Sequence, residues 1–417
     1  MTKISKGNKN SVRYAILCHI YEHYENSLFS FTAPFIATVF FPETDLVSAK
    51  LGIYMALTAG FLMSPFGATI FSWIGDRYGP RTSMIYAIFL SIIPMMLVGL
   101  LPGYSTLGSL SPFILLVARI AQGISIGGAF FATVTFIAEV SSPARRNINM
   151  GILLSMGFVG SLLGTLLMAF FRMSCMPSYM WRFAFLLGGV FGVSLYLFRG
   201  KFQESNAWKK AEKSEARVPF FHAVVECPRN IASVFLFGGS LLIPFYIAVT
   251  WLPGYLAEAL HIQDTFNLMV SSSLLLITGL GMIVFCWLAT FLNLKKMLYW
   301  SAASIVLPVF LIYSGLKNHH YGLLLGAQII IAIYTSFQGA AAFLLIQKLF
   351  PVKYKYSGFA IPFALGKSIF TMSVPMVAEL ILKKTGSAHN ITYLLIFSSL
   401  LILLGTVMAH PFQENKK

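Results

Sequence analysis

The chain has 417 residues, of which 57% are hydrophobic and 11% are charged, and its mean hydropathy is +0.76. A water-soluble protein of this length could not cover so much apolar surface, so the composition excludes an ordinary soluble enzyme or binding domain. The formal charge of +16 does not indicate nucleic-acid binding, because the basic residues stand singly or in pairs between apolar runs and do not line one face.

Apolar segments long enough to cross a hydrocarbon core, about 20 residues each, recur along the whole chain. Backbone groups in lipid must be hydrogen-bonded within their own element, so we expect these segments to be helices. The sequence predicts twelve spans, at 14–37, 51–73, 82–101, 111–138, 147–171, 182–199, 231–253, 267–292, 297–316, 321–349, 357–382 and 391–410.

The longest polar stretch falls midway and separates six spans from six. We therefore predict an all-α integral membrane protein with twelve transmembrane helices in two six-helix bundles. The predicted parts are an N-terminal tail (1–13), an N-terminal bundle (14–200), a central loop (201–230), a C-terminal bundle (231–410) and a C-terminal tail (411–417). This layout is typical of a secondary transporter with its solute site between two related halves, near the membrane midplane.

The lysines and arginines indicate how the chain is oriented. Pairs such as Arg77 and Arg81, or Lys295 and Lys296, fall in alternate connecting segments, and the opposite loops carry few basic residues. Because basic loops stay on the cytoplasmic side, we expect both termini and the central loop in the cytoplasm, and a multi-pass protein of the cytoplasmic (inner) membrane.

No cofactor or metal site is expected from the standard patterns. The chain has no P-loop or other nucleotide motif, which argues against an ATP-driven pump. Its cysteines are far apart and show no C-x-x-C spacing, so neither a disulfide framework nor a zinc site is indicated; they are Cys18, Cys175, Cys227 and Cys286.

One loop carries a family signature. The segment Gly75-Asp76-Arg77-Tyr78-Gly79-Pro80-Arg81, between the second and third predicted spans, resembles the G-D-R-x-G-R-R loop of the major facilitator superfamily. Several other segments, in order along residues 18 to 387, resemble one subfamily, the metabolite:proton symporters that include proline/betaine, α-ketoglutarate, citrate and shikimate transporters. They are Glu22-His23-Tyr24-Glu25 (E-W-Y-D in the family), Phe40-Phe41-Pro42 with Asp45, Gly99-Leu-Leu-Pro102-Gly-Tyr104, Arg119-x-x-Gln122-Gly123-x-x-x-Gly127-Gly128, Ala138-Glu139, Arg145-Arg146, Trp181-Arg182, Trp251-Leu-Pro253-x-Tyr255-Leu, Leu349-Phe350-Pro351 and Tyr356-Ser357-Gly358.

The resemblance implies the twelve-helix major facilitator fold and a transporter, not an enzyme. It also implies proton-coupled symport of a small zwitterionic or organic-acid metabolite by alternating access. We expect a monomer whose partners are the solute, protons and the lipid bilayer, with no nucleic acid. A dicarboxylate carrier of the same family and a non-transporting membrane sensor on the same scaffold are the alternatives.

The chain departs from the subfamily at several ionisable positions, which leaves the substrate open. Ser64 stands where the family usually has Arg and Ala129 where it has Glu; losing both avoids an unpaired buried charge if the two normally pair. The remaining departures are Pro80 for Arg, His23 for Trp, the cation Lys367 at a usually neutral position, and Leu294-Lys295-Lys296, which lacks the acidic residue of the first-half loop.

Charged and polar residues inside the spans are candidates for substrate binding and proton coupling, because burying a charge in lipid is costly. They are Glu22, Glu25, Arg119, Gln122 and Lys367. Glu22 and Glu25 enter from one end of the first span and Arg119 from the other end of the fourth, so we expect them to meet near midplane. A substrate carboxylate that takes Arg119 would then release a glutamate to bind a proton. The alternative is a pair that only locks two helices.

Two further groups complete the predicted site. By resemblance, a set of charged residues forms a conformational latch that parts during alternating access; these residues are Asp76, Arg77, Arg81, Glu139 and Arg145. Simple topogenic charge is the alternative. Aromatic residues could build a wall for a quaternary ammonium by cation–π attraction, or else pack and anchor; these residues are Tyr21, Tyr24, Tyr54, Trp251 and Tyr255.

One short motif favours a different class of protein. His19-Ile-Tyr-Glu22-His23 matches H-x-x-E-H, a zinc-peptidase pattern with two histidines one helical turn apart. A peptidase would need a further ligand from another helix, and the sequence offers no evident acidic candidate. We therefore expect no metal here and keep the transporter interpretation.

Overall fold

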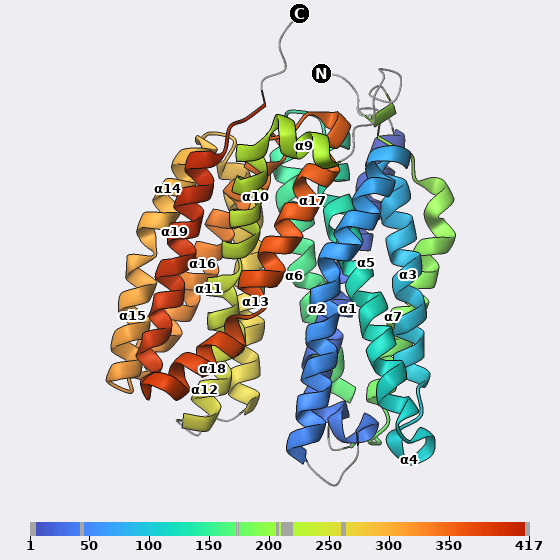
Figure 1. The fold of residues 1–417 in the computed structure, drawn as a ribbon, viewed down its shortest axis with the longest axis vertical. Coiled ribbons are helices and arrows are strands. Elements are labelled where there is room, and N and C mark those ends of the chain that lie inside the picture. Colours follow the sequence, from blue (N-terminus) through green and yellow to red (C-terminus); the bar gives the residue numbers. More distant parts are fainter. Residues whose placement is uncertain are drawn as a thin grey trace, which may run out of the picture. The chain divides into compact units, whose positions relative to one another are not determined.

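The computed structural model describes residues 6–41, 46–171, 173, 175–205, 208–209, 220–259 and 264–412. Within these ranges all regular structure is helical and no strand is present (Figure 1). The predicted all-helical class is confirmed.

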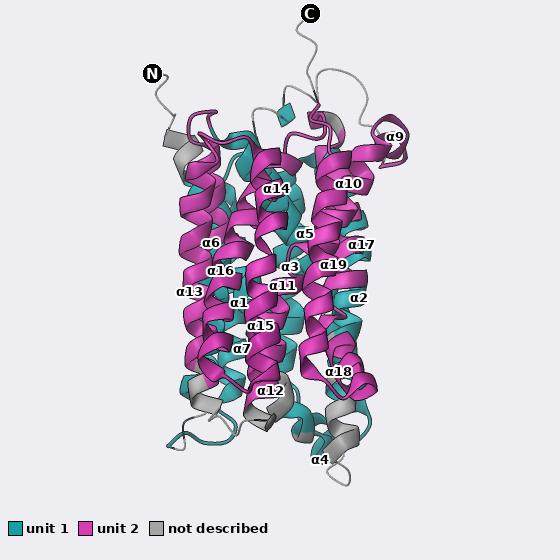
Figure 2. Cartoon of the chain, turned by 90° about the vertical axis from the view of Figure 1, so that its left-hand side faces the viewer, with its two compact units in different colours: residues 1–141, 156–217 teal, residues 142–155, 218–417 magenta. Residues whose placement is uncertain are grey.

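The chain forms two compact units (Figure 2). The first comprises Met1–Ser141 and Met156–Arg217, and the second comprises Ser142–Ser155 and Val218–Lys417. One helix, α6 (Arg146–Phe171), therefore contributes to both units. The exact domain boundaries expected from the sequence stay predictions.

The helices of the first unit, apart from α6, follow the sequence in order. They are α1 (Lys6–Phe40), α2 (Leu46–Tyr78), α3 (Pro80–Leu100), the short α4 (Tyr104–Leu107), α5 (Leu110–Val140), α7 (Trp181–Leu197) and the 3₁₀ turn η1 (Phe198–Lys201).

The second unit contains more and shorter elements. They are α9 (Phe220–Glu226), α10 (Pro228–Ser240), α11 (Ile243–Tyr246), η2 (Ile247–Trp251), α12 (Leu252–Ala259), α13 (Asp264–Leu288), α14 (Leu294–Ser304), α15 (Val306–Lys317), α16 (Tyr321–Ile346), η3 (Val352–Tyr354), α17 (Lys355–Gly366), η4 (Lys367–Thr371), α18 (Val374–Thr385), η5 (Ala388–Ile391) and α19 (Thr392–Met408).

The helices are long enough to cross a membrane. Among the described residues, ten helices or helix series are both long and apolar enough to span. In addition, α1 has 35 residues and α2 has 33. Each of the twelve predicted spans coincides with one of these twelve elements.

Three spans predicted as continuous helices are interrupted, and a proline explains each break. Proline has no N–H for the hydrogen bond to the residue four positions earlier. Pro244 follows the end of α10, Pro308 follows the step between α14 and α15, and Pro375 follows the end of η4. The interrupted spans are those predicted at 231–253, 297–316 and 357–382.

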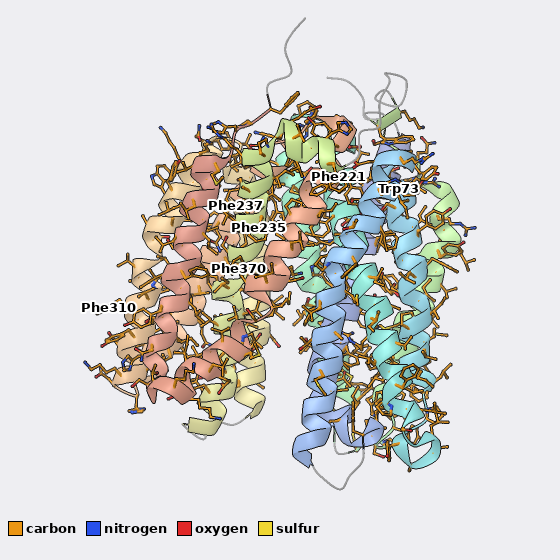
Figure 3. The ribbon with its side chains drawn as sticks, in the orientation of Figure 1. Trp73, Phe221, Phe235, Phe237, Phe310 and Phe370 are labelled. Atoms are coloured by element: carbon orange, nitrogen blue, oxygen red, sulfur yellow. The ribbon has the colours of Figure 1, made fainter. Side chains whose placement is uncertain are left out.

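Large apolar side chains remain exposed on the outward faces of the helices. Trp73 on α2 is 53% exposed and Phe310 on α15 is 63% exposed (Figure 3). Soluble proteins rarely expose extended apolar surface, so these faces are suited to lipid.

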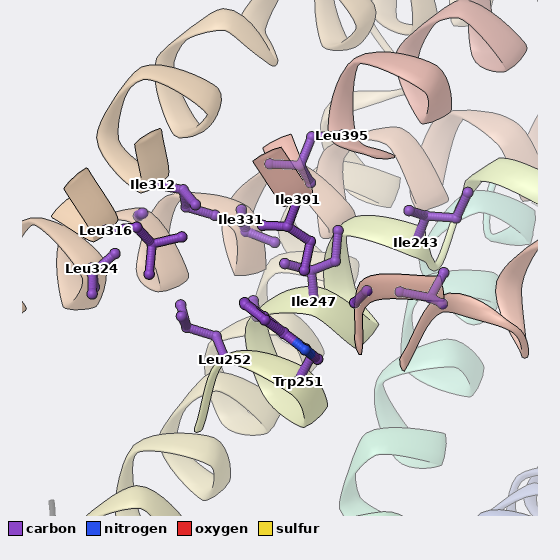
Figure 4. Packing of buried hydrophobic residues seen from close by; sticks show 14 of the residues in the cluster. Ile243, Ile247, Trp251, Leu252, Ile312, Leu316, Leu324, Ile331, Ile391 and Leu395 are labelled. Atoms are coloured by element: carbon purple, nitrogen blue, oxygen red, sulfur yellow. The ribbon is translucent and has the colours of Figure 1, made fainter. Parts of the chain in front are cut away.

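Each unit has its own apolar core. In the first, the rings of Phe29 and Phe40 on α1 meet Phe185 and Trp181 on α7 at centroid distances of 6.5 and 5.9 Å. In the second, residues of α11, η2 and α12 pack against α15, α16 and the region from η5 to α19 (Figure 4). These cores fix the helices that carry the polar residues described next.

The helices α2 and α5 approach each other closely enough for backbone contact. A Cβ atom added at Gly123 would lie 1.8 Å from the carbonyl oxygen of Gly60, and one at Gly127 would lie 2.0 Å from that of Ser64. Only glycine fits at such crossings, which are common between membrane helices. The contact holds α5 and its Arg119 firmly against α2.

Candidate functional site

The first span carries a buried polar stripe. His19, Glu22 and Glu25 on α1 are 0%, 5% and 1% exposed. Their spacing of three residues places them on one side of the helix. The structure therefore buries inside the first unit the two glutamates predicted as coupling residues.

Arg119 lies opposite this stripe on α5 and is completely buried. Its Nη1 donates a hydrogen bond of 2.7 Å to Oε1 of Gln122, one turn along the same helix. Its guanidinium carbon lies 3.8 Å from the centroid of the Phe29 ring on α1, and its charge interacts with that of Glu25. Glu25, Arg119 and Gln122 thus form one polar cluster within the first unit, which we call the α1–α5 cluster.

Several atoms of the α1–α5 cluster lack a hydrogen-bond partner among the described residues. They are Glu25 Oε1, Arg119 Nε, Arg119 Nη2 and Gln122 Nε2. Buried polar atoms are nearly always satisfied, so a group of orphans in one place indicates a site for water or a polar ligand. Nε and Nη2 form one edge of the guanidinium, which is the edge that can bind a carboxylate with two parallel hydrogen bonds.

A glycine of α2 packs against this edge of the guanidinium. A Cβ atom at Gly60 of α2 would lie 3.2 Å from Nη2 of Arg119. A larger residue would crowd the guanidinium, so the close approach of α2 to Arg119 requires a glycine at this position.

Lys367 belongs to the second unit, where it begins the π-helical turn η4. It is half-buried. A second π-helical turn, η2, interrupts the seventh predicted span and ends at Trp251. Such π turns are rare and are frequent at functional sites. Here η4 packs on α10 through Phe370 and Phe235, whose ring centroids are 5.8 Å apart (Figure 3).

The predicted aromatic residues are found in different surroundings. Tyr21 is buried and its hydroxyl accepts a hydrogen bond of 3.0 Å from Ser91, while the Tyr24 hydroxyl donates one of 2.6 Å to the carbonyl of Ala184. Both therefore pack inside the first unit. The side chain of Tyr54 lies outside the part of the chain that the structure describes.

Trp251 and Tyr255 form an aromatic pair in the second unit, with ring centroids 5.1 Å apart and planes at 14°. Trp251 Nε1 donates a 2.8 Å hydrogen bond to Oε1 of Glu379 on α18. The three residues line a pocket of about 200 Å³. Sequence reasoning missed Glu379, although it is an acidic residue within the predicted span 357–382 and could have been noticed on that ground.

The predicted latch residues Arg77 and Arg81 contact aromatic rings. The guanidinium carbon of Arg77 lies 5.3 and 5.6 Å from the ring centroids of Trp73 and Tyr78, and that of Arg81 lies 5.5 Å from Phe202. Arg81 also donates from Nη2 to the carbonyl of Arg199 at 2.9 Å. The contacts of Arg81 join the start of α3 to the segment that follows α7.

That segment supplies partners that sequence reasoning missed. The backbone N–H of Arg81 donates a hydrogen bond of 3.2 Å to Oε1 of Glu204, Ser205 Oγ donates to Oε2 of Glu139, and Trp208 Nε1 donates to the carbonyl of Asp76 at 3.4 Å. We call these six residues the linker cluster. Phe202 and Trp208, large apolar residues in a polar stretch, were the only sequence signal for it.

Glu204 of the linker cluster packs closely against the turn at Gly79. A Cβ atom at Gly79, whose φ is +98°, would lie 2.1 Å from Glu204 Oε2, so only glycine suits this turn. Burial raises the pKa of Glu204, while the N–H groups of Ser205 and Arg81 and the charge of Arg81 oppose the shift. The remaining predicted latch residue, Arg145, is exposed and belongs to the second unit.

Comparison with known proteins identifies the family. The sequence model of the Major Facilitator Superfamily matches residues 18–361. A putative proline/betaine transporter of Staphylococcus haemolyticus (strain JCSC1435) is 26% identical over 407 residues, covering 95% of this chain and 86% of that protein. The alpha-ketoglutarate permease of Escherichia coli (strain K12) is 25% identical over 402 residues, covering 94% and 91%.

Solved structures show the same fold. The major facilitator proton:xylose symporter XylE, bound to 6-bromo-6-deoxy-D-glucose, superposes with a TM-score of 0.80 at 14% identity and covers 97% of this chain and 95% of that one. The E. coli fucose:proton symporter FucP gives a TM-score of 0.69 at 11% identity, covering 96% and 99%. The predicted fold of twelve transmembrane helices in two bundles is confirmed.

The zinc-peptidase alternative is thereby excluded, because the family model and the relatives are transporters and not enzymes. The chain is a multi-pass membrane protein of a class that carries small solutes. It belongs to the major facilitator superfamily.

Proposed function

We propose that the protein is a proton-coupled symporter of a small zwitterionic metabolite, similar to proline or betaine, and that it works by alternating access. The observation that supports this most directly is the group of orphan polar atoms in the α1–α5 cluster. Arg119 and Gln122 offer hydrogen-bond donors, and Glu25 offers a carboxylate oxygen. A zwitterion presents the complementary charges, a carboxylate for Arg119 and a cationic group for the glutamates.

The coupling scheme follows from the charges of the cluster. In the absence of solute, Arg119 attracts Glu25. A substrate carboxylate that binds the Nε–Nη2 edge of Arg119 competes with Glu25 for the positive charge of the guanidinium. Glu25 then gains a proton more readily, because its positive neighbour is neutralised. Solute and proton are therefore bound together and released together.

The names of the relatives agree with this substrate class. The staphylococcal relative is described as a putative proline/betaine transporter, and a Dickeya dadantii relative, 24% identical over 430 residues, as a glycine betaine/proline/ectoine/pipecolic acid transporter. An organic dianion is the second candidate, because Lys367 adds a second cation and the E. coli relative is an alpha-ketoglutarate permease.

A panel of labelled solutes in sealed vesicles tests the proposal. The purified protein is reconstituted and assayed for counterflow of proline, betaine and α-ketoglutarate, and then for uptake driven by a proton gradient. We expect counterflow of a zwitterion and, at 100 mV, accumulation of about fifty-fold for each coupled charge, since that potential contributes about 2.3 kcal/mol per charge. Counterflow of no solute at all would favour the sensor alternative.

Glu25→Gln separates coupling from transport. We expect this variant to lose gradient-driven accumulation but to keep counterflow, because its side chain no longer exchanges a proton. Glu212→Gln, which removes a carboxylate from the polar stretch between the halves, is the matched control and should behave as the unaltered protein. Proton-driven accumulation by Glu25→Gln would show that Glu25 is not the coupling acid.

Arg119→Lys tests the carboxylate site. Lysine keeps the positive charge but loses the planar edge with two donors. We expect the apparent affinity for the solute to fall about tenfold or more, the loss of roughly one charge-assisted hydrogen bond. An unchanged affinity would place the solute carboxylate elsewhere.

We also propose that the protein functions as a monomer in the inner membrane with both termini in the cytoplasm, as the distribution of basic residues indicates. Cys175 is exposed and lies in the connection between α6 and α7, which this orientation places outside. A membrane-impermeant maleimide should therefore label intact cells that express the protein, and Cys175→Ser should abolish the labelling. Labelling only after the cells are opened would reverse the orientation.

A further inference from the structure

We propose that α1 carries a binding site for a divalent transition-metal ion of the zinc class, formed by His19, Glu22 and His23. Among the described residues, these three form the one group of side chains whose potential ligand atoms all lie within 4.8 Å of one another. All three belong to the first unit. The proposal is independent of the transport cycle, although Glu22 is also a candidate coupling residue.

The hydrogen bonds of His19 leave its Nε2 available as a ligand. The Thr133 hydroxyl on α5 donates to the carbonyl of Phe130 at 2.8 Å, so it must accept from Nδ1 of His19, which lies 3.2 Å away. That contact places the proton of a neutral imidazole on Nδ1 and the lone pair on Nε2. His19 is fully buried, and its Nε2 has no hydrogen-bond partner among the described residues.

His23 has the same tautomer for a similar reason. Its Nδ1 lies 3.1 Å from the backbone carbonyl oxygen of His19, which can only accept. The proton is therefore on Nδ1, and the lone pair of Nε2 faces away from the backbone. Metal-binding histidines typically donate their second ring N–H to a carbonyl, carboxylate or hydroxyl in this way.

The two Nε2 atoms lie close to the same point of α6. A Cβ atom at Gly157 would lie 2.9 Å from Nε2 of His19 and 2.9 Å from Nε2 of His23. The absence of a side chain at Gly157 therefore lets both ring nitrogens lie against α6 at one place, and the ring centroids are 4.3 Å apart. A zinc ion binds imidazole nitrogen at about 2.0–2.1 Å, so small ring rotations would bring both nitrogens into range.

Glu22 supplies the negative charge that a divalent cation requires. Its Oε2 lies 3.7 Å from Nδ1 of His19, and one of its carboxylate oxygens lies within 4.8 Å of a ring nitrogen of each histidine. Two histidines one turn apart with a carboxylate are the ligand set of many zinc sites, and imidazole also suits nickel, cobalt and copper ions. Because the three ligands share one helix, the remaining coordination position stays open to water or an anion. His23 is partly exposed and provides the entry side.

The test is direct binding of Zn²⁺ to the purified full-length protein in detergent, with any histidine tag removed. Binding is followed by competition with a fluorescent chelator, and Co²⁺ is added separately to record the absorption bands of a low-symmetry site. We expect one ion per chain, with affinity reduced at least about tenfold in His19→Ala and His23→Trp. His23→Trp installs the residue of the subfamily that the chain resembles, so this variant should fold.

Two further variants probe the geometry. Gly157→Ala keeps all three ligands but places a methyl group beside both Nε2 atoms, and Thr133→Val removes only the hydrogen-bond partner of His19. We expect Thr133→Val to weaken Zn²⁺ binding by about 10–100-fold, as loss of outer partners does elsewhere. Gly157→Ala should also weaken it, because its methyl group would lie 2.9 Å from both ring nitrogens. His222→Ala, which removes an exposed histidine on α9, is the matched control and should leave binding unchanged.

The proposal is overturned if the unaltered protein binds neither ion, or if His19→Ala and His23→Trp bind Zn²⁺ as tightly as it does. A loss in His222→Ala equal to theirs would assign the ion to surface histidines and would also overturn it. Because the measurement is metal binding, failure of the transport assays leaves this result unaffected.

Discussion

Gly123→Ala tests the closest helix contact of the first unit. In an ordinary contact, the new methyl carbon and the carbonyl oxygen of Gly60 need at least 3.4 Å, but the structure allows 1.8 Å, so α2 and α5 must separate by up to 1.6 Å. Overpacking costs about 1–3 kcal/mol, and more where backbone must move. Alanine's helix propensity returns up to about 1 kcal/mol, so we expect a net loss of about 2 kcal/mol in the free energy of unfolding.

Gly326→Ala is the matched control for this substitution. Gly326 lies inside α16, and a Cβ atom there would meet no heavy atom within 4 Å. We expect no loss, or a gain of about 0.5–1 kcal/mol from the stiffer backbone. Unfolding is followed by circular dichroism as sodium dodecyl sulfate is added to protein in mild-detergent micelles. If Gly123→Ala unfolds at the same point as the unaltered protein, the backbone contact between α2 and α5 is not present in the native state.

Substitutions at three further positions have defined outcomes in the same unfolding assay. Asn230→Ala removes a buried side chain that donates to the carbonyls of Leu349 and His410 at 2.8 and 2.9 Å, and it should lose about 2–3 kcal/mol; a loss under about 0.5 kcal/mol would contradict the network. Asn293→Ala removes the N-cap of α14 and should lose about 1 kcal/mol, whereas Asn293→Ser should restore most of it. Because burial raises the pKa of Glu204, its charged form disfavours the folded chain, and the unaltered protein should gain stability as the pH falls from 7 toward the ordinary value of 4.5. Glu204→Gln should show a smaller gain, and equal pH profiles would refute this reasoning.

The sequence predicted the helices well because lipid imposes a simple requirement. Every backbone group in a span must be hydrogen-bonded locally, so length and apolarity alone mark each helix. The interruptions near Pro244, Pro308 and Pro375 were not predicted, since a proline can also be accommodated inside a helix, as Pro65 is in α2. Whether a proline breaks a helix depends on neighbours that composition does not reveal.

Polar contacts far apart in sequence were harder to predict. The proximity of Glu25 to Arg119 could be predicted, because the depth of each residue in the membrane can be estimated from its position along its own predicted span. The contact of Glu204 with Arg81 joins residues 123 positions apart through an irregular segment, which no periodicity describes. Glu379 stands out as an acidic residue in a predicted span, but nothing in the sequence indicates its partner Trp251, which lies on another span.

The two units share one close backbone contact between helices that their sequences do not predict. In the first, a Cβ atom at Gly160 of α6 would lie 2.3 Å from the carbonyl oxygen of Ile20 on α1; in the second, one at Gly366 of α17 would lie 2.0 Å from that of Phe235 on α10. In each case the fifth predicted span of a half meets the first through backbone atoms.

Such a contact needs only a small residue, so it can persist while side chains around it differ. In each unit this contact also lies beside a residue that is a candidate for proton coupling or substrate binding. Ile20 precedes Glu22 by two residues, and Gly366 directly precedes Lys367. The charged side chains are therefore carried by helix pairs whose spacing is set by backbone, not by the charges themselves. Neutral substitutions at Glu22, Glu25 or Lys367 should accordingly alter transport without loosening the helix pairs, which makes function and stability separable in this fold.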